Sequence, residues 1–324
     1  MTNFPSGVVK VLVFAASPLA GPSINMLAQQ NKLAGVVLTE EVDAFSYQLE
    51  NWLQEMQLPF LRFNSAQPDL LLQKLMLWEV NLAINFSFPQ ALPQQLLDMT
   101  AFYNFHPAPL PKYQGPMALY WQIRDGQTQT QLTLQKANVE KGEADIGATL
   151  DMPIHPLDTL QSLQGKVAQQ VPQLLYQFIE ELVQKGETLV PQQGERSQAA
   201  VVQEADLYVD WLTMTSEQIC ALARAGNAHL GGCIVKLGQT PINLLQATAV
   251  KHPTFGVNPG TICHIGEPQG VIVATKNGAL RLDILSNADG VFSGLSFTDR
   301  FGVNAGMEFS SVGITNQYKC IYGG

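Results

Sequence analysis

The first half of the chain alternates short apolar runs of strand length with segments whose apolar residues recur at helical spacing. The strand-like runs are Val8–Phe14, Gly35–Leu38, Pro59–Phe63, Val80–Phe86 and Phe102–Phe105. The helical patterns between them lie at Ser23–Gln30, Ala44–Met56 and Leu70–Leu77. This alternation is typical of βαβ units, which build a parallel sheet with helices on both faces. We therefore predict an α/β fold with a doubly wound, mostly parallel, Rossmann-like sheet.

The second half of the chain has a different pattern. A long helical pattern covers Thr159–Val183, and the segment Pro191–Gln198 that follows is polar, contains Pro and Gly, and has no apolar period. Thr215 and Gln218 then have the spacing of a capping box at the start of a helix. Five short strand-like runs follow, separated by turns that contain Gly: Cys233–Leu237, Ile242–Ala247, Thr261–Ile265, Val271–Thr275 and Leu280–Leu285. Five short strands after a helix predict a small C-terminal OB-like β barrel.

The length of 324 residues favours two domains, each with its own core. We predict a first, catalytic domain over residues 1–189, a linker over 190–203, an OB-like domain over 204–310 and a tail over 311–324. No apolar run is long enough to span a membrane, and the N-terminus lacks the features of a secretory signal. We expect a cytoplasmic protein without a membrane partner, and the sequence leaves its oligomeric state open.

The charge balance argues against a polyanionic partner. The chain holds 18 Lys and Arg against 27 Asp and Glu, which gives a net charge of −9. Beyond residue 200 there are seven basic residues against nine acidic ones, without any basic cluster. Proteins that bind nucleic acid normally group basic side chains to displace counterions. The four cysteines form no Cys-x-x-Cys pair, so neither a disulfide framework nor a metal site is expected.

Polar residues gather where the strand Phe102–Phe105 ends. Asn104 and His106 lie two residues apart, so their side chains share one face of the strand. Pro107 begins a proline-rich loop that stops the strand pairing. Open α/β sheets bind ligands at the carboxyl ends of their strands. Asp145, in a loop after the next predicted strand, could reach the same edge.

An amide, an imidazole and a carboxylate together suit acyl transfer to an amine. The Asn104 amide could stabilise negative charge on a carbonyl oxygen. The His106 imidazole and the Asp145 carboxylate could orient each other and move a proton from the amine to the leaving nitrogen. Taken singly, each residue is more often structural, since Asn-x-His can cap a turn and Asp before Gly is common in turns.

The sequence around these residues resembles a known family. Asn104-Phe105-His106 with Leu110-Pro111 and Gly115 matches the Asn-x-His-x-x-x-Leu-Pro-x-x-x-Gly signature of 10-formyltetrahydrofolate-dependent formyltransferases. Asp145-Ile146-Gly147 resembles the family's Asp-x-Gly. The similarity continues through Asp210-Trp211 and Arg224-Ala225 into the predicted barrel, as in the methionyl-tRNA formyltransferase type. It therefore covers nearly the whole chain.

The resemblance implies a catalytic trio, a folate loop and an acceptor site, and no metal. The catalytic residues would be Asn104, His106 and Asp145. The residues that bind the formyl donor, 10-formyltetrahydrofolate, would be Asn85, Phe86, Ser87, Phe88, Leu92, Glu143 and Ala144. The residues near the acceptor would be Ala16, Ser17, Pro109, Gln114 and Gly115.

Several positions depart from the family pattern. Ala16 stands for a Gly in the first loop, Ser87 for a Gly in the folate loop, and Gln114 for a usual Arg. The tRNA enzymes carry a basic insertion after the second strand, whereas here the segment Thr39–Asp43, with three acidic residues, leads directly into a helix. The basic insertion that would bind the acceptor stem of a tRNA is therefore missing.

Four functions remain open from the sequence. The favoured one is N-formylation of a small primary amine, such as an amino sugar, an amino acid derivative or a peptide precursor. The alternative is formylation of initiator methionyl-tRNA, which the two-domain layout supports and the charge opposes. Hydrolysis of the formyl donor and a non-catalytic folate-binding role are the other two.

Overall fold

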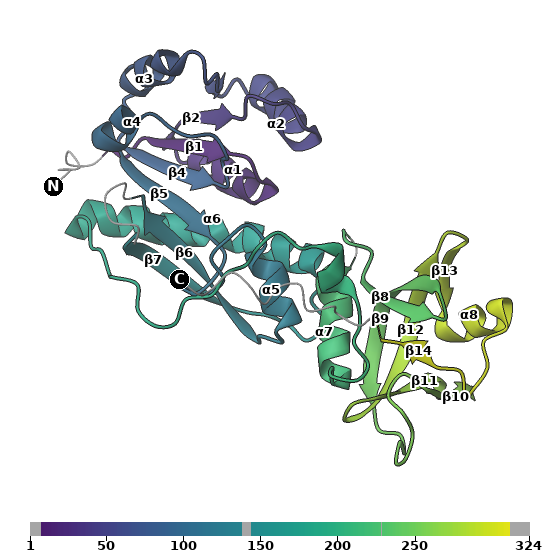
Figure 1. The fold of residues 1–324 in the computed structure, drawn as a ribbon. Coiled ribbons are helices and arrows are strands. Elements are labelled where there is room, and N and C mark those ends of the chain that lie inside the picture. The colour runs from purple at the N-terminus through teal and green to yellow at the C-terminus, as the bar shows by residue number, and fades with distance from the viewer. Residues whose placement is uncertain (1–7, 138–143, 228, 312–324) are drawn as a thin grey trace, which may run out of the picture. The chain divides into compact units, whose positions relative to one another are not determined.

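The computed structural model describes residues 8–137, 144–227 and 229–311, which divide into two compact units. The first unit holds the chain up to Ala118, then Gln129–Pro153 and Gln164–Ala199. The second holds Leu119–Thr128, Ile154–Leu163 and the chain from Ala200 onward. Figure 1 shows both units, with most of their helices and strands labelled.

The first unit is built on a seven-stranded sheet in the order β3-β2-β1-β4-β5-β6-β7. Its strands are β1 (Val11–Ala15), β2 (Leu33–Leu38), β3 (Phe60–Arg62), β4 (Leu82–Phe86), β5 (Ala101–His106), β6 (Gln129–Lys136) and β7 (Ile146–Pro153). Strands β1 to β5 pair in parallel, and β6 and β7 are antiparallel to their neighbours. The strand order reverses between β1 and β4, where ligands of open α/β sheets commonly bind.

Helices cover both faces of this sheet. They are α1 (Gly21–Gln29), α2 (Ala44–Glu55), α3 (Pro68–Leu77), α4 (Gln94–Met99) and α6 (Leu160–Lys185), with a short 3-10 turn η1 (Pro18–Ala20) before α1. Leu71 of α3 and Leu96 of α4 pack in one cluster with Phe102 of β5. The next residue, Tyr103, points to the opposite face and meets Phe178 of α6 with ring centroids 4.7 Å apart. The doubly wound, mostly parallel sheet predicted from the sequence is confirmed.

The differences from the sequence prediction have physical reasons. Met56, the last residue of the predicted helical pattern Ala44–Met56, lies just beyond α2 and is 55% exposed. Strand β7 was not predicted, because most of its residues are only partly buried and it carries no apolar alternation. Helix α4 is six residues long, which is too short to establish a helical period.

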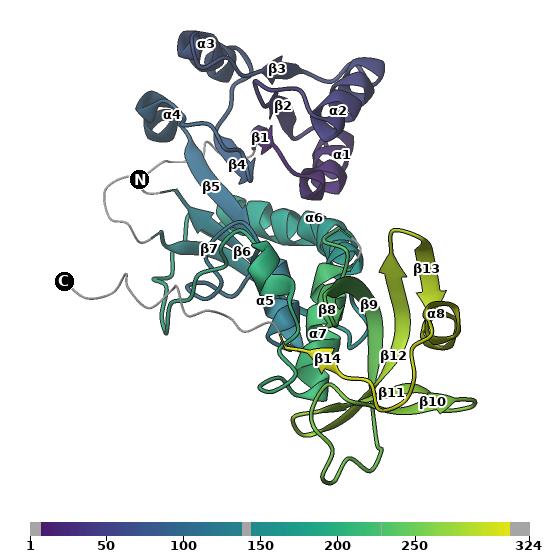
Figure 2. The ribbon, with the colours of Figure 1, turned by 45° about the vertical axis from the view of Figure 1, so that its right-hand side comes forward.

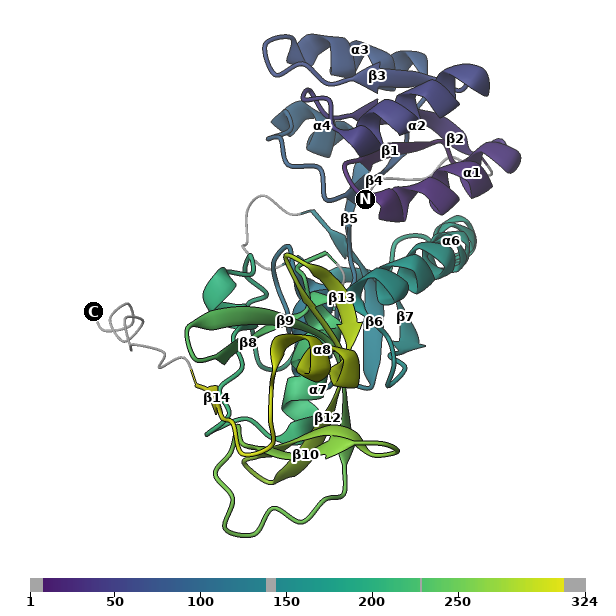
Figure 3. The same cartoon turned by 90° about the vertical axis from the view of Figure 1, so that its right-hand side faces the viewer.

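The second unit contains a curled antiparallel sheet in the order β10-β11-β12-β9-β8-β14, with β13 paired to β12. Its strands are β8 (Cys233–Leu237), β9 (Thr240–Val250), β10 (Ile262–Gly266), β11 (Gly270–Thr275), β12 (Gly278–Asn287), β13 (Gly290–Ser293) and β14 (Phe309–Ser310). The remaining helices are α5 (Ala118–Arg124), η2 (Glu204–Leu207), α7 (Ser216–Gly226) and α8 (Gly294–Phe301). Figures 2 and 3 show the curl of this sheet and α8 beside β13. The half barrel agrees with the predicted OB-like element.

Local signals in the second unit act as the sequence predicts. Thr215 caps α7, because its hydroxyl accepts from the Gln218 amide while the Gln218 side chain accepts from the Thr215 amide. Strands β11 and β12 form a hairpin that closes with Thr275 opposite Gly278. No helix among the residues that the structure describes is long and apolar enough to cross a membrane.

A partly buried polar contact joins the chain after α6 to the sheet and gives a stability prediction. The Tyr103 hydroxyl donates to the Glu187 carboxylate, which also pairs with the Lys136 ammonium group. Burial and this carboxylate raise the pKa of Tyr103 well above its ordinary value. A hydrogen bond to a charged group contributes about 1.5–3 kcal/mol. Tyr103→Phe is therefore expected to lower the free energy of unfolding by about 2 kcal/mol in urea denaturation.

Tyr176→Phe provides the matched control for that measurement. Tyr176 lies on the same helix as Phe178 but is 47% exposed, and no described residue hydrogen-bonds to its hydroxyl. Its substitution is expected to change stability by less than about 0.5 kcal/mol. Equal effects of the two substitutions would contradict the role given to the Glu187 contact.

Candidate active site

Strand β5 brings two predicted catalytic residues to one face at its carboxyl end. Asn104 and His106 are partly buried, while Phe105 between them is buried on the other face. Asn104 lies opposite Gln135 and His106 opposite Thr133 of β6. Asn104 is thus paired with both β4 and β6 and His106 with β6, so their Cα–Cβ bonds leave the strand on the same face.

The Asn104 amide has a defined orientation because of Asn85, at the end of β4. The Phe88 backbone N–H donates to Asn85 Oδ1 over 2.7 Å, and a backbone N–H can only be a donor. The other end of the Asn85 amide is therefore Nδ2, which donates to Asn104 Oδ1 over 2.9 Å. Asn104 Nδ2 then faces away from Asn85, with no acceptor among the described residues. Two N–H groups remain available for an oxygen of a bound molecule.

The protonation of His106 is also defined by its surroundings. His106 Nε2 lies 2.8 Å from the carbonyl oxygen of Tyr113. A carbonyl oxygen only accepts, so the proton of the neutral imidazole is on Nε2 and the lone pair is on Nδ1. Burial lowers the pKa of His106, and the Tyr113 carbonyl opposes this shift only in part. The ring is therefore neutral at pH 7 and able to accept a proton on Nδ1.

Asp145 lies beside β6, the strand that pairs with β5. Its carbonyl accepts from the Lys136 amide over 2.8 Å, just before β7 begins at Ile146. Lys136 itself pairs with Tyr103, one residue before Asn104. Among the described residues, no hydrogen bond joins the Asp145 side chain to Asn104 or His106. The backbone of Asp145 therefore lies beside the end of β6.

The loop after β4 contains the predicted folate residues. Ser87 has φ of +60°, a backbone conformation that Gly adopts without strain, so Ser keeps the backbone expected of the family's Gly. The Phe86 and Phe105 rings lie 5.3 Å apart, and Phe88 lies 5.3 Å from Phe14. Leu92 packs against the same core cluster as Phe88.

Gln90 in this loop was not singled out from the sequence. Its Oε1 is buried and has no hydrogen-bond partner in the described structure. A buried acceptor without a donor is costly, so such a group commonly marks a ligand or water site. Nothing in the sequence distinguishes Gln90 from the two Gln residues that soon follow it.

The first loop lies next to the loop after β4. The Ala16 N–H donates to the Phe86 carbonyl over 3.1 Å. The Ser17 hydroxyl accepts from the Leu19 amide at the start of η1. These contacts place the predicted acceptor residues Ala16 and Ser17 at the reversal of strand order between β1 and β4.

The loop after β5 contains the other predicted acceptor residues. The Pro109 carbonyl accepts from the Lys112 amide, and Gln114 bonds to the segment around Ser197. Gly115 is exposed, with φ of +124°. Ala144 is described, and its carbonyl accepts from the Gln192 side chain. The predicted residue Glu143 lies outside the described residues.

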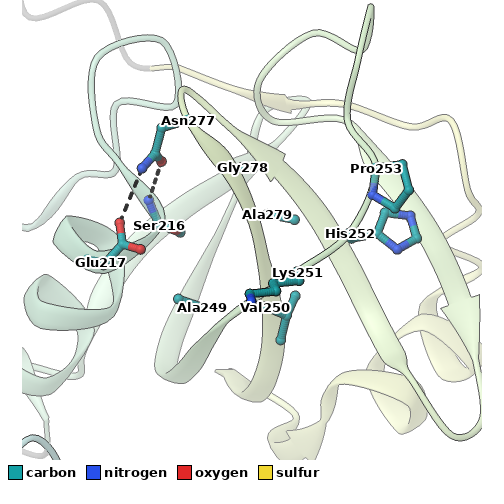
Figure 4. A pocket seen from close by; sticks show the side chains of 10 residues that line it. All are labelled: Ser216, Glu217, Ala249, Val250, Lys251, His252, Pro253, Asn277, Gly278 and Ala279. Carbon is teal, nitrogen blue, oxygen red and sulfur yellow. Dashed lines mark hydrogen bonds between the residues drawn. The ribbon is translucent and has the colours of Figure 1, made fainter.

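The second unit holds a separate hollow of about 710 Å³, shown in Figure 4. It lies between the start of α7, the end of β9 and the hairpin at Asn277. Asn277 bridges the Ser216 amide and the Glu217 carboxylate there. None of its lining residues was predicted as a site residue. No group of three or more His, Cys, Asp or Glu within residues 8–137, 144–227 and 229–311 could hold a metal ion.

Comparison with known families agrees with this geometry. The formyl transferase family model matches residues 10–179, and the formyl transferase C-terminal domain matches residues 202–294. The chain belongs to the formyl transferase family, as the sequence motifs predicted. A methionyl-tRNA formyltransferase of Coprothermobacter proteolyticus is 27% identical over 289 residues, which cover 85% of this chain and 90% of the relative.

Two solved structures share the fold. An N-formyltransferase from Helicobacter canadensis, solved with folinic acid and dTDP-3-aminofucose, has a TM-score of 0.62 and 13% identity over 84% of this chain and 98% of its own. HypX from Aquifex aeolicus, solved with tetrahydrofolic acid, has a TM-score of 0.56 and 17% identity over 91% of this chain. The match covers 48% of HypX, so this chain corresponds to about half of that protein.

The pH dependence of stability tests the environment of His106. Because folding lowers its pKa, the unfolded chain binds this proton more readily than the folded chain does. The contribution of neutral His106 to the free energy of unfolding is fully present above the ordinary imidazole pKa of about 6.5. It declines as the pH falls below that value. His106→Gln lacks this titration. The free energy of unfolding of the wild type minus that of His106→Gln should therefore decrease from about pH 7.5 to about pH 5.5. An increase would contradict the buried, neutral imidazole.

Proposed function

We propose that this formyltransferase moves a formyl group from 10-formyltetrahydrofolate to the primary amine of a small molecule. The observation that carries the proposal is the oriented pair on β5. Asn104 presents N–H groups and His106 presents a lone pair, both from the same face of one strand. The N–H groups can stabilise negative charge that develops on a carbonyl oxygen, and the lone pair can accept the proton that an amine loses.

The residues of the loop after β4 fit the formyl donor. The unpartnered buried oxygen of Gln90 is an acceptor, and a pterin ring carries N–H donors. The apolar side chains of Phe88 and Leu92 border the same loop. Asn85, Phe86, Ser87, Phe88, Leu92, Glu143 and Ala144 remain the residues proposed to hold the donor. HypX and the Helicobacter canadensis enzyme were solved with tetrahydrofolic acid and folinic acid, which supports a folate compound as the donor.

The donor supplies the formyl group, and the protein's residues orient it and handle charge and proton. Asn104 Nδ2–H donates to the formyl oxygen as negative charge develops during attack by the amine nitrogen. His106 Nδ1 accepts the proton that the amine loses and can deliver it to the folate nitrogen as the bond from carbon to that nitrogen breaks. Asp145 is proposed to complete the trio when the substrates are bound, since apo geometries are often looser than reactive ones.

The loop after β2 supports a small acceptor. It is short, and Arg62 Nη1 donates to the Thr39 carbonyl over 2.6 Å while the same guanidinium pairs with Glu50. The exposed Glu40 and Glu41 carboxylates add negative charge. Negative charge at this edge would repel phosphates and accept a neutral or cationic amine. Ala16, Ser17, Pro109, Gln114 and Gly115 remain the residues proposed near the acceptor.

Initiator methionyl-tRNA is the second candidate acceptor. The methionyl-tRNA formyltransferase of Coprothermobacter proteolyticus matches this chain over most of both lengths. The C-terminal domain family match supports the same layout. The scarcity of basic residues opposes this candidate, because several phosphates would have to be neutralised.

The test is tetrahydrofolate release from 10-formyltetrahydrofolate at low and physiological salt. The acceptors are a panel of primary amines, including amino sugars, then initiator methionyl-tRNA, and no acceptor. We expect the best small amine to exceed tRNA in kcat/KM at physiological salt. Efficient formylation of tRNA there, within the usual range of about 10⁴–10⁸ M⁻¹s⁻¹, would favour the second candidate.

His106→Ala is the control for the chemistry in this assay. Loss of a general base commonly lowers turnover by about 10²-fold or more, and affinity for the donor should persist. If tetrahydrofolate is released without any acceptor, and His106→Ala abolishes this release, the protein would be a hydrolase of the formyl donor. Absence of release under all conditions, with folate still bound, would indicate a non-catalytic relative and contradict the proposal.

A further inference from the structure

The segment Ser197–Ala199 lies along the loop after β5 like a short parallel strand, and we call it the strap. Gln114 and Gln198 form a parallel bridge. The Gln114 N–H donates to the Ser197 carbonyl over 2.8 Å, and the Ala199 N–H donates to the Gln114 carbonyl over 2.6 Å. The Ser197 hydroxyl also accepts from the Tyr113 N–H over 2.8 Å. Tyr113 and Gln114 are thus held by a segment about 84 residues later in the chain.

These bonds orient the carbonyl that meets His106. The Tyr113 carbonyl and the Gln114 N–H belong to one planar trans peptide, so they point in opposite directions. The Ser197 carbonyl accepts from the Gln114 N–H, and the Ser197 hydroxyl accepts from the Tyr113 N–H. Because both N–H groups of Tyr113 and Gln114 are held by Ser197, the Tyr113 carbonyl points away from the strap and reaches His106 Nε2. Tyr113 also has φ of +57°, which is uncommon for a bulky residue and persists only where surrounding contacts require it.

The close approach of the strap depends on Gly115. A Cβ atom at this position would lie 2.6 Å from the Ala199 carbonyl oxygen. Its φ of +124° is also one that residues with side chains rarely adopt. Gly115 therefore allows the backbone of the loop to come close enough to the strap to form these hydrogen bonds.

We propose that the strap positions His106 for proton transfer by holding the Tyr113 carbonyl against Nε2. The carbonyl keeps the proton on Nε2, so Nδ1 stays available to the substrate. Ser197 is then a positioning residue, since it acts through Tyr113 and not on a substrate. Its importance for catalysis rests on the proposed function, whereas its effect on the imidazole does not.

The test combines NMR of the imidazole nitrogens with kinetics in the full-length protein. Protein labelled with ¹⁵N at its five histidines reports the tautomer of His106, which is assigned by its loss in His106→Ala. Wild type should show the Nε2–H form alone. Ser197→Ala should populate the Nδ1–H form and lower kcat by about fivefold, which corresponds to one ordinary hydrogen bond, with little change in KM for the formyl donor. Ser197→Thr, which keeps the hydroxyl, should restore both.

Two further variants separate this effect from a general loss of structure. In Gly115→Ala, the added Cβ atom would collide with the Ala199 carbonyl of the strap. This variant should therefore also populate both tautomers of His106. Ser310→Ala removes a serine hydroxyl that bonds to the Lys236 and Gly238 carbonyls in the second unit, and should alter neither readout.

The results test the positioning role of the strap separately from the proposed formyl transfer. An Nδ1–H form in the wild type, or an unchanged tautomer and kcat in Ser197→Ala, would overturn the positioning role. A tautomer shift in Ser197→Ala in a protein that formylates no acceptor would support the positioning of His106 and refute the formyl transfer instead.

Discussion

The site depends on the pairing of β5 along both of its edges. On one side β5 pairs in parallel with β4, and on the other it pairs antiparallel with β6. A strand held in this way keeps the alternation of its side chains, so Asn104 and His106 share a face while Phe105 packs on the other. The parallel neighbour also brings Asn85 level with Asn104. The pairing with β6 thus holds both residues, and the pairing with β4 holds Asn104 beside Asn85.

Backbone groups determine how these two side chains are used. A backbone N–H orients Asn85, which orients Asn104. A backbone carbonyl orients His106 and locates its proton. Backbone donors and acceptors cannot exchange roles, so both orientations follow from bonds of known direction. The result is an N–H donor and a proton acceptor on one strand face, which is the combination that acyl transfer to an amine requires.

Part of this arrangement was predictable from the sequence. The apolar periods gave the α/β sheet and the small antiparallel unit, because each period reflects which face of an element is buried. The two-residue spacing placed Asn104 and His106 on one face. The family motifs gave the formyl transferase family, which the family comparison confirms.

Other features depend on contacts that no local pattern contains. Asn85 was predicted to bind the formyl donor, whereas its bond to Asn104 depends on the register of two strands. The meeting of Tyr113 with Ser197 joins residues far apart in the chain, and the polar segment around Ser197 carries no period that predicts pairing. The place of Asp145 depends on the loop before β7 and not on a repeating element, and its role in the trio stays a prediction. The acceptor depends on surface chemistry and stays a proposal.

In the proposed reaction, Asn104 acts through the N–H groups that its bond to Asn85 leaves free. The most direct measurement is the single-turnover rate of tetrahydrofolate formation by Asn104→Asp, together with its dissociation constant for the formyl donor. Aspartate keeps the shape of asparagine and an oxygen for Asn85, but it has no N–H to donate. The rate is expected to be about 10²–10³-fold lower, as for loss of an oxyanion donor, with affinity for the formyl donor within about threefold. A rate close to that of the wild type would contradict this role of Asn104.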